Sequence, residues 1–149
     1  MHHNLAFLGF GNVARSLVRL LERKRDLLKE KYDLTYSVTG IATGRHGFAV
    51  DPNGLAIQQA LALVESRQSI SPITNRQFPI TDSLSVIQHS HADVMFENSP
   101  VNHKTGQPAL DHIRAALGLG MHAITANKGP VVHGHRELTD LAESKGRKF

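Results

Sequence analysis

A glycine-rich turn near the start of the chain has the residue types and the spacing that cradle a pyrophosphate. The turn consists of Gly9, Phe10, Gly11, Asn12, Val13 and Ala14. Gly9 permits a tight turn, Gly11 has no side chain to block the approach of a ligand, and Ala14 lets a helix pack closely on a strand. The unpaired N–H groups and the dipole of the following helix favour an anion. We therefore predict that a dinucleotide binds here; the alternative is a turn that only connects a strand to a helix.

The segment after the second apolar stretch bears on the choice of dinucleotide. NAD-binding domains place a carboxylate at this point, where it accepts a hydrogen bond from the adenosine ribose. Residues 41–47 of this chain include no acid. Arg45 could instead pair with a 2′-phosphate, helped by the Thr43 hydroxyl. The alternative is an exposed loop arginine. The sequence therefore favours NADP, with NAD as the second choice.

Two polar loops follow apolar stretches in the second half of the chain. Residues 98–100 come after the stretch 93–97, and Lys128 comes shortly after the stretch 121–125. Open α/β sheets bind ligands at the carboxyl ends of their strands, so both loops are expected at one edge. There, Lys128 could bind a carboxylate or polarise a carbonyl oxygen as a hydride arrives. The alternative is a surface lysine that caps its own loop.

The elements that must position these residues alternate between strands and helices. Apolar and β-branched stretches predict strands over residues 4–8, 34–42, 78–81, 93–97 and 121–125. Helical spacing and capping residues predict helices after the glycine turn as far as residue 31, then over 55–64, 83–89, 108–119 and 134–145. Asp82 is the expected N-cap of the third of these helices. The pattern predicts a Rossmann-type, doubly wound and mostly parallel sheet with helices on both faces.

Composition excludes several classes of function. A chain of 149 residues suits one domain, and no apolar run approaches the ~18 residues that span a membrane. The absence of cysteine excludes disulfides and thiolate catalysis and fits the cytoplasm. The net charge of +4 is dispersed and only 5% of residues are aromatic, which argues against nucleic acid. Ten histidines show no metal-ligand spacing, so we expect no metal site.

Several motifs in the second half of the chain together resemble homoserine dehydrogenase. They are Glu97-Asn98-Ser99-Pro100-Val101-Asn102, Thr105-Gly106-Gln107-Pro108-Ala109 and Thr125-Ala126-Asn127-Lys128-Gly129-Pro130. With the glycine turn, the resemblance spans nearly the whole chain. It implies an NAD(P)-dependent enzyme of amino-acid biosynthesis that interconverts aspartate semialdehyde and homoserine. It also implies that Asn98, Ser99, Pro100 and Asn127 contact the cofactor and that Lys128 faces the substrate.

The resemblance also bears on domain organisation. Enzymes of that family continue beyond the segment that corresponds to residues 145–149 into a substrate-binding and dimerisation domain. We therefore expect residues 1–149 to be the dinucleotide-binding domain alone, inactive by itself, and the full-length enzyme to be a homo-oligomer. Two alternatives stay open: a stand-alone, non-catalytic nucleotide-binding module, and a related two-domain amino-acid dehydrogenase.

Overall fold

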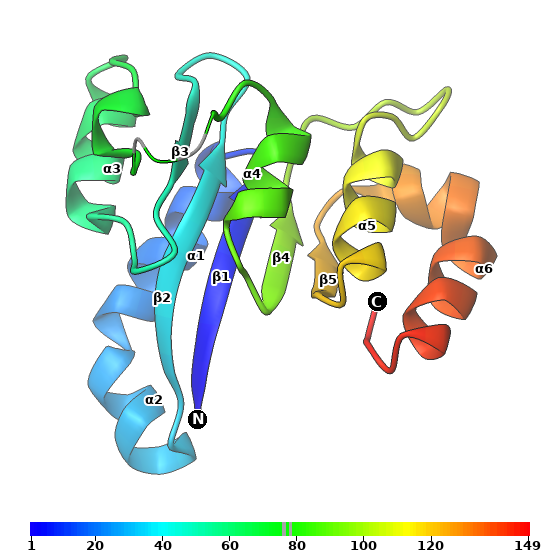
Figure 1. Ribbon diagram of the computed structural model, residues 1–149, viewed down its shortest axis with the longest axis horizontal. Coiled ribbons are helices and arrows are strands. Elements are labelled where there is room, and N and C mark those ends of the chain that lie inside the picture. The colour runs from blue at the N-terminus through cyan, green and yellow to red at the C-terminus, as the bar shows by residue number, and fades with distance from the viewer. Residues whose placement is uncertain (76, 78) are drawn as a thin grey trace.

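The computed structural model describes residues 1–75, 77 and 79–149, which form a five-stranded sheet flanked by helices (Figure 1). The strand order is β3-β2-β1-β4-β5. The strands are β1 (His2–Leu8), β2 (Thr35–Ala42), β3 (Phe48–Val50), β4 (Val94–Glu97) and β5 (His122–Thr125). All neighbours are parallel except β3, which runs antiparallel to β2. The described residues thus form the mostly parallel α/β fold that the sequence predicts.

Helices cover both faces of this sheet. They are α1 (Asn12–Arg23), α2 (Arg25–Tyr32), α3 (Ile57–Glu65), α4 (Ser83–His89), α5 (Ala109–Gly118) and α6 (Lys128–Ser144), with a short 3-10 helix at Ser71–Ile73. In Figure 1, α4 lies in front of the sheet and α1 behind it, while α5 and α6 lie side by side beyond β5. None of the described helices is both long and apolar enough to cross a membrane.

Strand β1 divides the core into two layers. Leu5 and Phe7 pack with the buried residues of α1 and α3, whereas Ala6 and Leu8 pack with those of α4, α5 and α6. Successive side chains of a strand point to opposite faces, so the four consecutive apolar residues at the end of β1, which are all buried, must be covered on both sides. The continuous apolar run that predicted β1 therefore also explains why helices lie on both faces.

The structure corrects the predicted helices in two places. The single helix expected as far as residue 31 is two helices, because the backbone at Lys24 (φ −102°, ψ 7°) breaks it. The helix expected over 134–145 begins at Lys128, with a kink at Gly134 (φ −144°, ψ 15°). The sequence places the start later because Gly129 and Pro130 are typical of a loop.

Two differences concern strands. The segment between the strand expected over residues 34–42 and the helix expected over residues 55–64 contains the short strand β3, which was not predicted from the sequence. Of the strand expected over residues 78–81, Phe78 lies outside the described residues, and residues 79–81 have no regular structure. The helix α4 that follows is confirmed, including its N-cap: Asp82 accepts a hydrogen bond from the Ser85 N–H (2.7 Å).

Candidate functional site

An open cleft of about 850 Å³ lies at the carboxyl ends of β1, β2 and β4. Its lining comes from the glycine turn, from the loop after β2, from the end of α3 and from the loop after β4. Seven of the predicted site residues line it together: Gly9, Phe10, Gly11, Thr43, Arg45, Asn98 and Pro100. The remaining predicted residues, Asn12, Val13, Ala14, Ser99, Asn127 and Lys128, are not among those that line this cleft.

The two glycines of the turn meet different surroundings. Gly9 has a φ of +86°, and a Cβ added to it would lie 2.5 Å from the backbone of Asn98 and Ser99. Gly11 is the N-cap of α1 in an extended conformation, and a Cβ added there would meet nothing within 4 Å. Only glycine fits the close approach at Gly9, whereas the space beside Gly11 belongs to the cleft.

The start of α1 offers free backbone donors to this space. No side chain caps the helix, and no acidic residue stands in its first turn. Ala14 is fully buried, so the helix packs closely against the sheet as predicted. Uncapped N–H groups and the helix dipole make such an end a site for an anion. The end of α1 therefore fits a pyrophosphate.

The loop after β2 brings Arg45 to the cleft but uses Thr43 internally. The Thr43 hydroxyl donates to the Gly47 carbonyl (3.0 Å) and accepts from the His46 N–H (2.6 Å), so it orders the loop. Arg45 is exposed and forms no ion pair with any described residue. Arg15 and Arg67, which the sequence interpretation did not single out, also line the cleft. A basic rim of this kind suits a phosphate.

The loop after β4 contains two polar groups that lack partners. Asn98 Nδ2 and Ser99 Oγ are buried and form no hydrogen bond with the described residues. Asn98 is anchored through its backbone N–H, which donates to the Leu8 carbonyl (2.6 Å). Buried polar groups without partners are rare and costly. These two are therefore candidates to bind a ligand.

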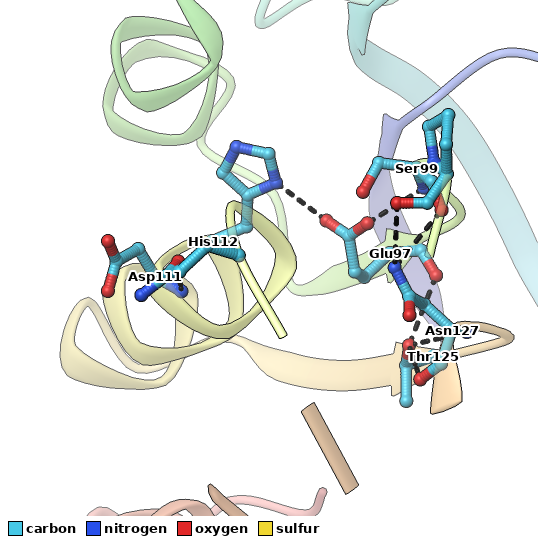
Figure 2. Close-up of polar contacts among 8 residues, drawn as sticks. Glu97, Ser99, Asp111, His112, Thr125 and Asn127 are labelled. Carbon is cyan, nitrogen blue, oxygen red and sulfur yellow. Dashed lines mark hydrogen bonds and ion pairs between the residues drawn. The ribbon is translucent and has the colours of Figure 1, made fainter. Parts of the chain in front are cut away.

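A buried carboxylate lies beneath this loop (Figure 2). Glu97 is fully buried; one of its oxygens accepts from the Ser99 N–H (2.7 Å) and the other lies 2.7 Å from His112 Nδ1. The sequence interpretation missed this pair as a functional element. Its only signal was an acid at the end of an otherwise apolar strand, and nothing in the sequence pointed to His112 as its partner.

Asn127 and Lys128 lie at the start of α6, next to the same loop. The Asn127 side chain accepts from the Gly129 N–H (2.9 Å) and donates to the Ser99 carbonyl (3.1 Å), so both its polar atoms are in use. Lys128 is exposed and forms no ion pair with a described residue. A cation in the first turn of a helix opposes the helix dipole. That cost suggests a role other than stability for Lys128.

The chemistry of the described side chains is otherwise limited. No group of three or more described His, Cys, Asp or Glu residues could hold a metal ion. The first strand of the sheet runs through a Gly-x-Gly turn into an uncapped helix, and an open cleft lies at the ends of the parallel strands. These features define the Rossmann-type class of α/β domain.

Comparison with known proteins specifies the class further. No family model matches the chain. The chain is 33% identical over 148 residues to the homoserine dehydrogenase of Methanocaldococcus jannaschii, covering 98% of this chain and 43% of that protein. It is 28% identical over 147 residues to the NAD(+)-dependent homoserine dehydrogenase of Pseudomonas canavaninivorans, covering 99% and 42%. The chain therefore spans less than half the length of these curated relatives.

Solved structures agree with this similarity. The putative homoserine dehydrogenase from Archaeoglobus fulgidus superposes with a TM-score of 0.78 and 26% identity, covering 98% of this chain and 41% of that one. A hyperthermophilic archaeal homoserine dehydrogenase in complex with NADPH shares the fold, with a TM-score of 0.77, 20% identity and coverage of 100% and 43%. The homologues and structural neighbours of this chain are homoserine dehydrogenases, and it corresponds to one part of them.

Proposed function

We propose that residues 1–149 form the NAD(P)-binding domain of an oxidoreductase that resembles homoserine dehydrogenase. The observation that carries this proposal is the uncapped start of α1, which faces open space beside Gly11. The homoserine dehydrogenase relatives, one named as NAD(+)-dependent and one solved with NADPH, support the same cofactor class. The established reaction of such an enzyme interconverts homoserine and aspartate semialdehyde.

The residues present fit the two ends of a dinucleotide. The N–H groups at the start of α1 would hold the pyrophosphate. The unpartnered Asn98 Nδ2 and Ser99 Oγ would receive the polar groups of the nicotinamide end. When bound, the nicotinamide would accept or return a hydride. The chain's own contribution is to fix that ring and, at Lys128, to bring a cation near the substrate.

The proposed cofactor is NADP rather than NAD. Arg45 is exposed at the cleft, and Arg15 and Arg67 line it as well. Arg15 is already occupied, because it lies 3.9 Å from Glu65 and donates to the Asn12 side chain (2.8 Å). Arg45 and Arg67 form no ion pair with a described residue, and of these two we assign the 2′-phosphate to Arg45, because it follows β2, where the adenosine ribose is expected.

Other properties of the longer enzyme follow from the same proposal. Its partners would be small molecules rather than nucleic acid, because the excess positive charge is small and dispersed. Assembly into a homo-oligomer would involve residues outside this dinucleotide-binding domain. A cytoplasmic location would suit an enzyme of amino-acid biosynthesis.

Titration calorimetry with NADPH and NADH tests the proposal. The unaltered chain should bind both dinucleotides, and Gly11→Val should abolish binding because a branched side chain would fill the space meant for the pyrophosphate. The variant should stay folded by circular dichroism, since a Cβ at this position meets no neighbour. Normal binding by folded Gly11→Val would place the dinucleotide elsewhere.

A further inference from the structure

Glu97 links three elements around the loop that follows β4. Its carboxylate lies between His112 of α5 and the backbone of Ser99 (Figure 2). The distance to His112 Nδ1 and to the Ser99 backbone nitrogen is 2.7 Å in each case. Ser99 in turn accepts a hydrogen bond from Asn127, which caps α6. One connected set of contacts thus runs from α5 through the loop to the start of α6, where Lys128 stands.

Stability alone does not account for a carboxylate at this position. Glu97 is fully buried and His112 is 7% exposed. Burying a carboxylate is costly even when it is hydrogen-bonded, and apolar residues of similar volume often give an equally stable or more stable core. The carboxylate instead fixes the orientation of the loop, because it accepts a hydrogen bond from the Ser99 N–H and is itself hydrogen-bonded to His112.

The loop held in this way carries the two unpartnered groups. Asn98 Nδ2 and Ser99 Oγ are buried without hydrogen bonds, while the backbone on either side of them is tied down at Leu8, Glu97 and Asn127. The backbone is therefore fixed at the points where the side chains are left free. Such an arrangement is preorganised for a ligand, which lowers the cost of ordering on binding.

We propose that Glu97 and His112 are positioning residues that hold the 98–100 loop in place for the nicotinamide end of the cofactor. This inference rests on the proposed function, since it presumes that a dinucleotide occupies the cleft. It assigns the pair no contact with the adenosine end, which would lie across the cleft at Arg45. Glu97 and His112 should therefore affect the binding of the nicotinamide end and leave the binding of the adenosine end unchanged.

Two ligands distinguish binding at the nicotinamide end from binding at the adenosine end. They are NADPH and 2′-phosphoadenosine diphosphate ribose, which lacks the nicotinamide. The readout is the ratio of their affinities for the 149-residue chain. His112→Leu, which removes the donor to Glu97, should lower the affinity for NADPH about tenfold, the effect of losing one hydrogen bond to a charged group. Its affinity for the shorter ligand should not change. His112→Asn places an amide donor near the former Nδ1 and should restore most of the ratio.

A double variant guards against loss of folding. Glu97→Leu with His112→Leu replaces the buried pair by apolar side chains, which a core tolerates well. It should melt cooperatively, bind the shorter ligand normally and show the same reduced ratio as His112→Leu. Ile113→Val is the matched control, because Ile113 is a fully buried neighbour on α5 outside this set of contacts. It should lower stability without changing the ratio.

The outcomes distinguish this inference from the proposed function. An unchanged ratio in the folded double variant overturns the positioning role. Equal affinity of the unaltered chain for the two ligands also overturns it, because the loop then contributes nothing at the nicotinamide end, although the dinucleotide site stands. Failure of the unaltered chain to bind either ligand overturns the proposed function, and this inference with it.

Discussion

At the scale of single residues, Gly9 and Gly11 show how one motif combines two constraints. Gly9 is fixed by the fold, because its φ of +86° and the backbone of Asn98 leave no room for a Cβ. Gly11 is free of both constraints, so we propose that its lack of a side chain leaves room for the ligand. The motif could be predicted from the sequence, but the division of roles between its glycines required the neighbouring loop after β4.

The first prediction contrasts these glycines by stability. Gly9→Ala should lower the free energy of unfolding by about 3 kcal/mol or more, since strain at a positive φ adds to a backbone clash. Gly11→Ala should leave stability nearly unchanged. Urea denaturation of both variants provides the measurement, with Gly11→Ala as the control. Equal stability of the two variants would mean that the loop after β4 can move to accommodate a Cβ at position 9 at little energetic cost.

The second prediction concerns Arg45 and the choice of cofactor. Arg45→Ala should weaken NADP binding by about 1.5–3 kcal/mol, the range for a hydrogen bond to a charged group. NAD binding should stay the same, because NAD lacks the 2′-phosphate. Calorimetric titration with both cofactors measures the difference. Arg67→Ala, at the same cleft, is the comparison variant; unchanged NADP affinity in Arg45→Ala would exclude this arginine.

The buried residues of the site were the least predictable from sequence. The hydrogen bond between Glu97 and His112 joins a strand to a helix residue 15 positions later in the chain. The identity of the two residues alone does not predict that they interact. Asn127 stays a predicted cofactor contact, and the structure adds that its amide joins the 98–100 loop to the start of α6. Side-chain direction decides both cases, and it depends on how β4, α5 and α6 pack together.

At the scale of elements, the apolar strands could be predicted well because two-sided burial makes them continuously apolar. Strand β3 was missed because three residues are too few to show a period. The first turn of α6 was missed because Gly129 and Pro130 usually mark a loop. Proline near the start of a helix costs no hydrogen bond, however, because the first N–H groups have no partner there.

The third prediction concerns the start of α4. Asp82 caps the helix, and hydrogen bonds from Ser85 hold the pKa of its carboxyl below the ordinary value of about 4. A lowered pKa in the folded state means that the charged cap stabilises the protein above the ordinary pKa, and that this benefit is lost as the pH falls through the lowered value. Asp82→Ala should therefore destabilise the protein at neutral pH more than at acid pH.

Thermal unfolding of Asp82→Ala and Asp82→Asn across acid and neutral pH measures this effect. Asparagine keeps the capping oxygen but has no charge to titrate. It should therefore retain more stability than alanine at neutral pH while losing the pH dependence. A constant difference between Asp82→Ala and the unaltered protein at all pH values would show that the charge contributes nothing.

At the scale of the whole molecule, the side of the site near Lys128 is open. Lys128 is exposed, and three large apolar residues near it in the chain are exposed as well: Ile124 (50%), Val131 (43%) and Val132 (75%). Among the described residues, none forms an ion pair with Lys128. The end of the site that we propose for the cofactor is thus lined by several elements, whereas the end that we propose for the substrate offers one cation, Lys128, beside exposed apolar residues.

The final prediction is that the 149-residue chain binds NADP but does not oxidise homoserine by itself. Hydride transfer requires the nicotinamide and the substrate carbon in near-attack geometry, and such alignment is worth roughly 7–11 kcal/mol. An exposed lysine cannot supply it, because it neither encloses the substrate nor excludes water. A dehydrogenase assay with NADP and homoserine should therefore show no turnover above background, although calorimetry detects cofactor binding. Lys128→Ala should bind NADP as the unaltered chain does, since the lysine lies outside the cleft. Turnover by the isolated chain would mean that these residues contain a complete substrate site, and loss of NADP binding in Lys128→Ala would move the lysine from the substrate to the cofactor.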